Sequence, residues 1–152
     1  MIFNNSSDSI TRDDILEIAS RLNIVIPQAV QAHYLRHNGG VPEPDCWTME
    51  NGEWHCVQTF LPMKHGRRTL ESVYLQGIEK DYLASNVVPF ANDAGGNYFC
   101  FEPRGRVYFY AMDGWNGERS IEENKKKATQ WLAPSFEGFI AGLVPNPEAS
   151  EE

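Results

Sequence analysis

Residues 97–110 read NYFCFEPRGRVYFY, in which aromatic and aliphatic side chains alternate on either side of a short connection. Alternation over four to eight residues is typical of β-strands, and a three-residue connection that contains glycine is typical of a hairpin. The connection here is Pro103-Arg104-Gly105, so Glu102 lies opposite Arg106. The sequence therefore predicts an antiparallel pair of strands whose register is set by this turn.

This register places the side chains of the two strands on two faces. One face is wholly apolar and consists of Phe99, Phe101, Val107 and Phe109. The other face consists of Tyr98, Cys100, Tyr108 and Tyr110. We expect the apolar face to lie in the core. Because tyrosine tolerates partial burial, the second face could be covered by a helix, a second copy of the chain or a partner.

Further elements are predicted on both sides of this hairpin. Capping residues and helical spacing of apolar residues predict helices over 8–23, from Pro27 to the stop at Asn38-Gly39-Gly40, over 69–77 and after Ser135. Strands are predicted over 86–91, 97–102, 106–111 and 128–132. The pattern predicts an α+β fold, with a central, mostly antiparallel sheet, an N-terminal helical pair and further helices packed on the sheet.

A second hairpin is predicted over residues 45–60, where Asn51-Gly52 is the strongest short turn signal. The register derived from that turn gives a core-facing side that carries Trp47, Met49, Trp54 and Cys56. Cys46 then lies opposite Val57 and points away from Cys56. This register disfavours a disulfide between the two cysteines.

Two polar segments are expected to lack regular structure. Residues 113–127 contain two glycines and a run of three lysines, and we expect a mobile loop there. Residues 145–152 are acidic and contain proline, so we expect a flexible tail. The tail would follow a single domain that covers residues 1–144.

The chain is acidic: its 152 residues include 13 lysines and arginines against 21 aspartates and glutamates, a net charge of −8. Residues 1–62 hold 3 basic and 8 acidic groups, residues 63–130 hold 10 and 9, and residues 131–152 hold 0 and 4. Such a charge repels phosphate backbones and anionic membranes, so we expect no direct nucleic-acid binding and no membrane binding. It favours a cationic protein partner, or solubility alone.

The cysteines favour a reducing compartment, because Cys46, Cys56 and Cys100 form neither a C-x-x-C pair nor an even set. No apolar run reaches the roughly 18 residues of a membrane span. Residues 1–9 lack the basic and apolar regions of a secretory signal. We therefore expect a cytoplasmic protein.

No group of residues in the sequence points to catalysis. His33 and His37 lie one helical turn apart, but no H-E-x-x-H motif or further ligand pattern accompanies them, and we expect solvated histidines or histidines at a helix C-terminus. The glycines of Gly95-Gly96-Asn97 could bind an anion through backbone amides, although a strand connection explains them more simply. We expect no enzyme, no metal and no cofactor.

Several segments, taken in order, resemble the SUKH superfamily, in particular its branch named for yeast cell-wall-synthesis regulators. The N-terminal pieces are Ile26-Pro27, Tyr34-Leu35 and Asn38-Gly39-Gly40. The later pieces are VPFANDAGGN at 88–97, FCF at 99–101, GRVYF at 105–109 and SFEGF at 135–139. The resemblance covers roughly residues 8–143.

The resemblance implies an α+β domain with a central sheet and no shared catalytic constellation. Bacterial members resemble immunity proteins, which implies that this chain binds a cognate protein toxin, such as a basic nuclease domain, and occludes its active site. Eukaryotic members imply the alternative of a non-catalytic regulatory interaction module in cell-envelope or stress signalling. Whether the chain also forms a homodimer is left open by the sequence.

If a basic partner binds, its positive charge attracts the acidic segments of this chain. The candidate contact residues are Glu43, Asp45, Glu50 and Glu53 around the second hairpin, with Asp113, Trp115 and Glu118 in the polar loop. Glycines lie on both sides of Trp115, so its ring is either an exposed anchor or folded back onto the core.

Overall fold

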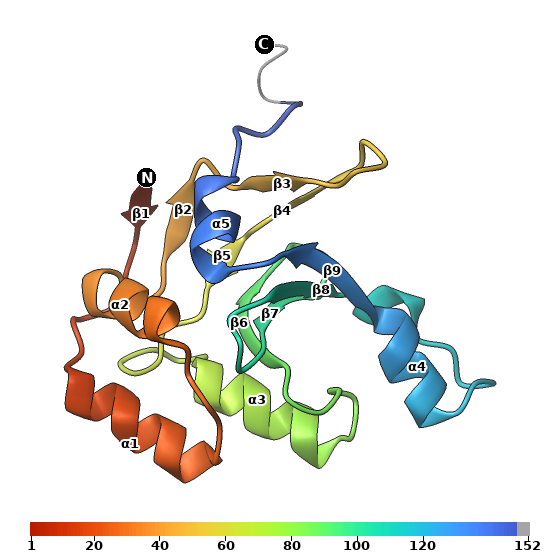
Figure 1. Cartoon of the computed structure of the whole chain (residues 1–152), viewed down its shortest axis with the longest axis horizontal. Coiled ribbons are helices and arrows are strands. Elements are labelled where there is room, and N and C mark those ends of the chain that lie inside the picture. The colour runs from red at the N-terminus through yellow and green to blue at the C-terminus, as the bar shows by residue number, and fades with distance from the viewer. Residues whose placement is uncertain (149–152) are drawn as a thin grey trace.

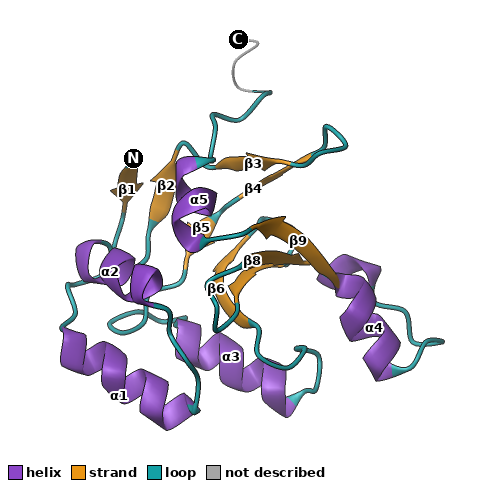
Figure 2. Ribbon diagram, in the orientation of Figure 1, coloured by secondary structure: helices purple, strands orange, loops and turns teal. Residues whose placement is uncertain are grey.

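A computed structural model describes residues 1–148 (Figures 1 and 2). The helices are α1 (Arg12–Leu22), α2 (Gln28–Arg36), α3 (Leu70–Glu79), α4 (Ile121–Ala128) and α5 (Phe136–Ala141), with a 3₁₀ helix η1 (Met112–Gly114). The strands are β1 (Ile2–Asn4), β2 (Val41–Glu43), β3 (Cys46–Thr48), β4 (Trp54–Cys56), β5 (Thr59–Phe60), β6 (Val88–Asn92), β7 (Tyr98–Phe101), β8 (Val107–Tyr110) and β9 (Thr129–Ala133). The predicted α+β class is confirmed.

The central sheet has five strands in the order β5-β6-β7-β8-β9, and every neighbouring pair is antiparallel. The predicted register of its middle hairpin is confirmed, because Phe101 pairs with Val107 and Phe99 pairs with Phe109. Two smaller sheets, β1-β2 and β3-β4, flank it. The β1-β2 pair had no counterpart among the predicted elements.

Helix α5 and the β3-β4 hairpin cover the apolar face of the sheet (Figure 1). The ring of Phe139 in α5 packs against Phe90 and Phe99, with ring centroids 5.7 and 5.5 Å apart. His55 of β4 stacks on Phe109 at 3.9 Å. This face therefore forms the centre of the core, as its alternation predicted.

The tyrosine-bearing face is covered by α3 and the segment that follows it. The hydroxyl of Tyr110 donates a hydrogen bond to the carbonyl of Tyr82 (2.6 Å) and accepts one from the amide of Ala84 (3.0 Å). Arg68 donates a hydrogen bond to the hydroxyl of Tyr98 (2.8 Å). Of the three covers that the sequence left open, the fold uses a helix with its flanking segments over Tyr98 and Tyr110, whereas Tyr108 is only half-buried.

The capping residues predicted at Thr11, Thr69 and Ser135 are confirmed, although α1 begins at Arg12 and not at residue 8 as predicted. Thr11 and Asp14 form a capping box at the start of α1, and the hydroxyl of Ser135 accepts a hydrogen bond at the start of α5. Pro27 is the N-cap of α2 rather than its first helical residue. Helix α2 ends at Arg36, and His37 is extended, so the glycines that follow serve the next loop and not the helix stop.

The predicted register of the second hairpin is wrong by one residue. The observed pairs are Cys46 with Cys56, Trp47 with His55 and Thr48 with Trp54. The loop is longer than we expected: Gly52 adopts a positive φ of 88°, and its amide bonds back to the carbonyl of Met49. A one-residue slip moves every side chain of a strand to its opposite face. Trp54 is therefore 39% exposed instead of buried.

The same slip overturns the prediction for the cysteines. Because Cys46 and Cys56 lie directly opposite each other, their side chains share a face, and they form a disulfide. Cys100 is free and buried in the central sheet. The cysteine count therefore gives no support to a reducing compartment.

The prediction of a mobile loop over 113–127 is also wrong, because α4 occupies its second half (blue in Figure 1). The hydroxyl of Ser120 caps this helix, two glutamates lie in its first turn and three lysines lie in its last turn, where the helix dipole favours them. The side chain of Asn124 is buried and bonds to both the amide and the carbonyl of Asn116. These bonds hold the remaining loop against the helix.

Leu143, the last core residue, is buried just after α5. Residues 149–152 of the predicted tail lie outside the described residues. No helix within residues 1–148 is both long enough and apolar enough to cross a membrane.

Candidate functional site

The β3-β4 hairpin projects beyond the sheet from a firmly attached base (Figure 1). At the base, Cys46 exchanges two backbone hydrogen bonds with Val144 (3.0 and 2.7 Å) in addition to its disulfide. Further along, Trp47 stacks on Phe139, with ring centroids 5.3 Å apart. The sequence thus places an acidic, exposed tip on a hairpin whose lower part is packed into the core.

Two predicted contact residues, Glu50 and Glu53, lie at this tip, and both are exposed. The side chain of Asn51 accepts a hydrogen bond from the amide of Glu53 (3.0 Å), which orders the turn. Neither glutamate forms an ion pair within residues 1–148. Their charges are therefore free to act on a partner.

The other two hairpin candidates, Glu43 and Asp45, lie beyond the base. Glu43 is exposed at the end of β2 and accepts a hydrogen bond from the side chain of Asn4 (3.2 Å). Asp45 is partly buried, and that burial raises the pKa of its carboxyl group above the usual range. Both residues line a shallow depression of about 620 Å³ beside β1, on a different part of the surface from the tip.

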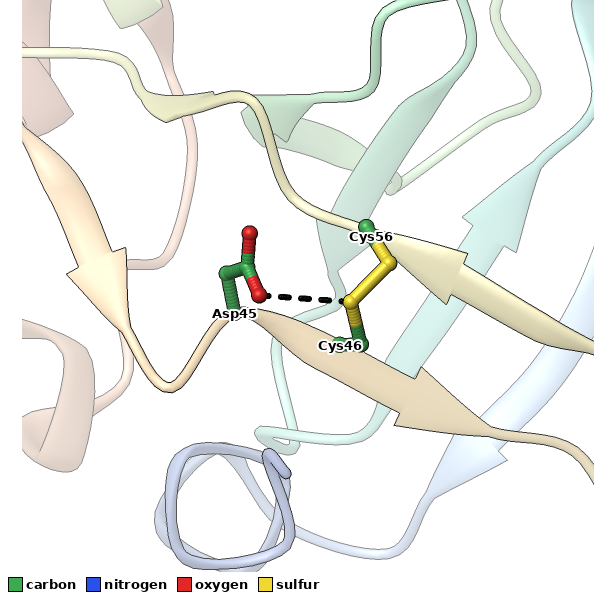
Figure 3. A group of neighbouring side chains, drawn as sticks. All are labelled: Asp45, Cys46 and Cys56. Atoms are coloured by element: carbon green, nitrogen blue, oxygen red, sulfur yellow. Dashed lines mark hydrogen bonds between the residues drawn. A yellow bond between two sulfur atoms is a disulfide. The ribbon is translucent and has the colours of Figure 1, made fainter. Parts of the chain in front are cut away.

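Asp45 also lies next to the disulfide (Figure 3), where one carboxylate oxygen is 3.2 Å from Sγ of Cys46. An aspartate and two cysteines could in principle hold a metal ion. The thiolate is the form of cysteine that binds metals, however, and both sulfur atoms are bonded to each other. In its disulfide form this cluster is a structural crosslink and not a metal site.

The predicted contact residues of the loop lie at a third place on the surface. Asp113 and Glu118 are exposed, whereas Trp115 is half-buried and packs against the core. The backbone amide of Asp113 donates a hydrogen bond to the buried side chain of Asn97 (3.1 Å). Of the two conformations left open for Trp115, the structure adopts the one that is folded back.

The seven candidates therefore occupy three separate places. The pockets that the hairpin candidates line, one beside β1 and one beside β9, contain no residue of the loop 113–118. A groove does join Glu50 to the last strand of the sheet. It has a volume of about 370 Å³, and Trp131 and Leu132 of β9 form its second wall. Trp131 was not among the predicted contact residues, although it lies in a predicted strand, 128–132, next to polar residues.

The two histidines lie at the C-terminal end of α2, as one of the two expectations had it, but they belong to an aromatic cluster and His33 is not solvated. The ring of His33 packs against Phe3 and Phe136, with centroids 4.9 and 5.3 Å apart, and its Nε2 is buried without a hydrogen-bond partner. Burial, followed by the positive charges of His37 and Arg36, lowers the pKa of His33 to about 4. His33 is therefore neutral at physiological pH and acts as a core residue.

The glycine turn before β7 also has a structural role. One carboxylate oxygen of Asp93 accepts hydrogen bonds from the amides of Gly95 (3.0 Å) and Asn97 (2.8 Å). These are the backbone donors that an anion would need. Asp93 therefore occupies the position that an anion would take.

The chain matches the SMI1 / KNR4 family (SUKH-1) over residues 9–142. This chain belongs to that family. It is also similar to a SPbeta prophage-derived uncharacterized protein, YokK, of Bacillus subtilis (strain 168), with 28% identity over 112 residues. The matched region covers 72% of this chain and 53% of YokK, so the chain spans about half the length of this curated relative.

In this SUKH-1 domain, the segments that carry the resemblance hold the fold together. The side chain of Asn38 donates hydrogen bonds to the carbonyls of Asp8 and Lys64 and accepts one from the amide of Met63. A Cβ atom on Gly39 would lie 2.8 Å from the backbone nitrogen of Pro62. The Asn38-Gly39-Gly40 motif therefore joins three chain segments, and the hairpin tip lies outside the segments that carry the resemblance.

Proposed function

We propose that this protein is an immunity protein that binds a cognate bacterial protein toxin and neutralises it by covering its active site. The observation that carries the proposal is the unpaired acidic tip of the β3-β4 hairpin, in a family that includes immunity proteins of toxin systems. The protein acts by binding, without catalysis and without a cofactor.

The chemistry of the tip suits a basic toxin surface. A nuclease must attract phosphate groups, so its active site carries positive charge. An acidic protein is steered toward such a surface and competes with the nucleic acid for it. The net charge of −8 and the free carboxylates of Glu50 and Glu53 supply that field.

The name of the relative reported above describes it as prophage-derived. We propose that the complex forms in the cytoplasm, where an immunity protein meets a toxin that has entered or been made in the cell.

We also propose outer contacts to the same partner. They are Glu43 and Asp45 beyond the hairpin base, and Asp113, Trp115 and Glu118 in the loop.

The test is co-expression of this protein with the product of the adjacent upstream toxin gene. We expect rescue of growth and a complex that survives gel filtration. The double variant E50K/E53K should weaken the complex, whereas E79K should not, because Glu79 is equally exposed but lies at the end of α3. If the wild-type protein neither rescues growth nor binds the toxin, that pairing is wrong.

A second measurement tests occlusion. A catalytically inactive toxin variant should still bind this protein, and the complex should no longer bind the toxin's nucleic-acid substrate. If the complex binds substrate as well as the free toxin does, the protein does not cover the active site. A complex with a signalling or envelope protein and no toxin partner would instead favour the regulatory interaction module.

A further inference from the structure

A groove lies beside the hairpin tip. Residues 47–51, from β3 and the turn, form one wall, and Trp131 and Leu132 of β9 form the other. Its volume of about 370 Å³ falls within the range of ligand sites. The groove therefore separates the small β3-β4 sheet from the edge of the central sheet.

Both walls are strands with an open side. Within residues 1–148, β9 pairs only with β8 and is the last strand of its sheet. Strand β3 pairs with β4 on one side, and its other side meets only Val144, through Cys46 at the base. The edge of a sheet presents backbone donors and acceptors that an extended peptide can bind as an additional strand. The groove thus lies between two unfilled strand positions.

The side chains around the groove define the chemistry of an occupant. Trp131 is 51% exposed, and Glu50 is the one charged residue that lines the groove. Glu53 adds a second carboxylate at the same tip, and no lysine or arginine lines the groove. An indole ring and a carboxylate together favour lysine or arginine, through cation–π and charge-assisted contacts.

We infer that this groove binds an extended, basic segment of the protein partner, which adds a strand between β3 and β9. Alternate side chains of that segment would place lysine or arginine beside Glu50 and Trp131, while its backbone pairs with a strand edge. This inference rests on the proposed function, because it assigns to the partner the segment that contacts the hairpin.

The first experiment uses a fluorescein-labelled ten-residue peptide of alternating lysine and valine as the probe. We expect it to bind the wild-type protein and to shift the amide resonances of residues 47–51 and 129–133. A peptide with glutamate in place of lysine should bind at least about tenfold more weakly. N-methylation of alternate backbone nitrogens removes the strand donors and should have a similar effect.

Matched variants identify the groove residues. E50K should weaken peptide binding by about fivefold, with E79K as the control for charge. W131S should weaken it by about tenfold, and I121S is its control, because Ile121 is 48% exposed and lies on α4. Circular dichroism verifies that each variant folds. Failure of the lysine peptide to bind, binding that N-methylation does not change, or resonance shifts elsewhere on the surface would each overturn the inference.

The toxin complex separates this inference from the proposed function. If the toxin binds and neither W131S nor E50K weakens the complex, the groove inference is wrong and the immunity function stands. If the lysine peptide binds in the groove but the toxin does not bind the protein, the groove stands and the toxin pairing is wrong.

Discussion

Cys46 and Cys56 lie directly opposite each other on β3 and β4, and their disulfide closes the base of the hairpin that carries the acidic tip. Cys46 is also fully buried, and its backbone is hydrogen-bonded to the backbone of Val144, which follows α5 in the chain. The crosslink therefore attaches the returning strand of the hairpin to the part of the chain that is anchored in the core. The position of the tip depends on this attachment.

Removal of the crosslink should destabilise the protein. For a loop of 10 residues, the chain-entropy account gives a loss of about 2.7 kcal/mol in the C46S/C56S variant. Urea denaturation of the oxidised wild type, the reduced wild type and the variant measures this loss. The reduced wild type should resemble the variant. Equal stability of the oxidised and reduced protein would contradict the prediction.

Rapid alkylation of thiols in growing cells tests which form of the hairpin is present there. A cytoplasmic location predicts that Cys46 and Cys56 are largely reduced in the cell, because that compartment maintains free thiols. Protection of both residues from alkylation would show that the crosslinked form exists in the cell and would contradict that expectation.

Alanine at Gly39 should be far more harmful than alanine at Gly52. Both glycines have a positive φ, 80° and 88°, so both variants incur a conformational cost of about 1 kcal/mol. A Cβ on Gly39 would also lie 2.8 Å from the backbone of Pro62, whereas a Cβ on Gly52 meets nothing within 4 Å. We expect G39A to lose at least about 1 kcal/mol more than G52A in urea denaturation. Equal losses of unfolding free energy in the two variants would show that the close contact between Gly39 and Pro62 does not affect stability.

The hydroxyl of Tyr34 should contribute measurably to stability. It is fully buried and donates a hydrogen bond to the carbonyl of Leu61 (2.8 Å), which links α2 to the loop after β5. Tyr34→Phe should cost about 1–2 kcal/mol, because a buried carbonyl loses its partner. Y108F is the control, since Tyr108 is only half-buried and its hydroxyl makes no hydrogen bond within the described residues. Denaturation midpoints that fall equally in the two variants would refute this account.

The protein should lose stability as the pH falls from about 6.5 to about 4. Burial lowers the pKa of His33 to about 4 in the folded state, while the unfolded chain takes up a proton near the ordinary value of 6.5. Protons therefore favour the unfolded state within this window, and the free energy of unfolding should fall by at most about 3 kcal/mol. Urea denaturation at pH 7 and pH 4.5 measures the change.

Variants identify the histidine responsible. His33→Phe should remove most of the pH dependence, whereas H37Q should remove less, because His37 is less deeply buried than His33 and burial lowers its pKa less strongly. The pKa of Asp14 is lowered to about 2, mainly by a hydrogen bond from the backbone of Thr11, so its stabilising effect is lost only below this window, as the pH falls toward 2. An unchanged pH profile in His33→Phe would assign the effect to other groups.

The parts of the fold that could be predicted are those that local residues determine. The three-residue turn before Arg106 leaves one register for β7 and β8, and Thr11, Thr69 and Ser135 mark helix starts through their own hydroxyl groups. The acidic tip was likewise visible as a cluster of carboxylates. Each of these features depends on residues close together in the chain.

The incorrect predictions concern side-chain contacts that one element does not contain, or one residue of register. The polar lysine run before β9 predicts a loop, but Ser120 caps a helix there and Asn124 holds that helix to Asn116, eight residues earlier in the chain. The observed register of the second hairpin differs from the predicted one because the loop that contains Gly52 is longer than a two-residue Asn51-Gly52 turn. No local pattern predicts the groove beside Trp131, because its two walls lie about 80 residues apart in the sequence.

The sequence by itself determined the α+β class, the central meander, most helix caps and the acidity of the hairpin, because alternation, capping and charge are local properties. Only the tertiary structure decided the Cys46–Cys56 pairing, the burial of His33 and the meeting of residues 47–51 with Trp131. Those outcomes depend on how β3, β9 and α5 pack together. Packing is a property of the whole chain, and a single residue of register is enough to reverse which side chains it buries.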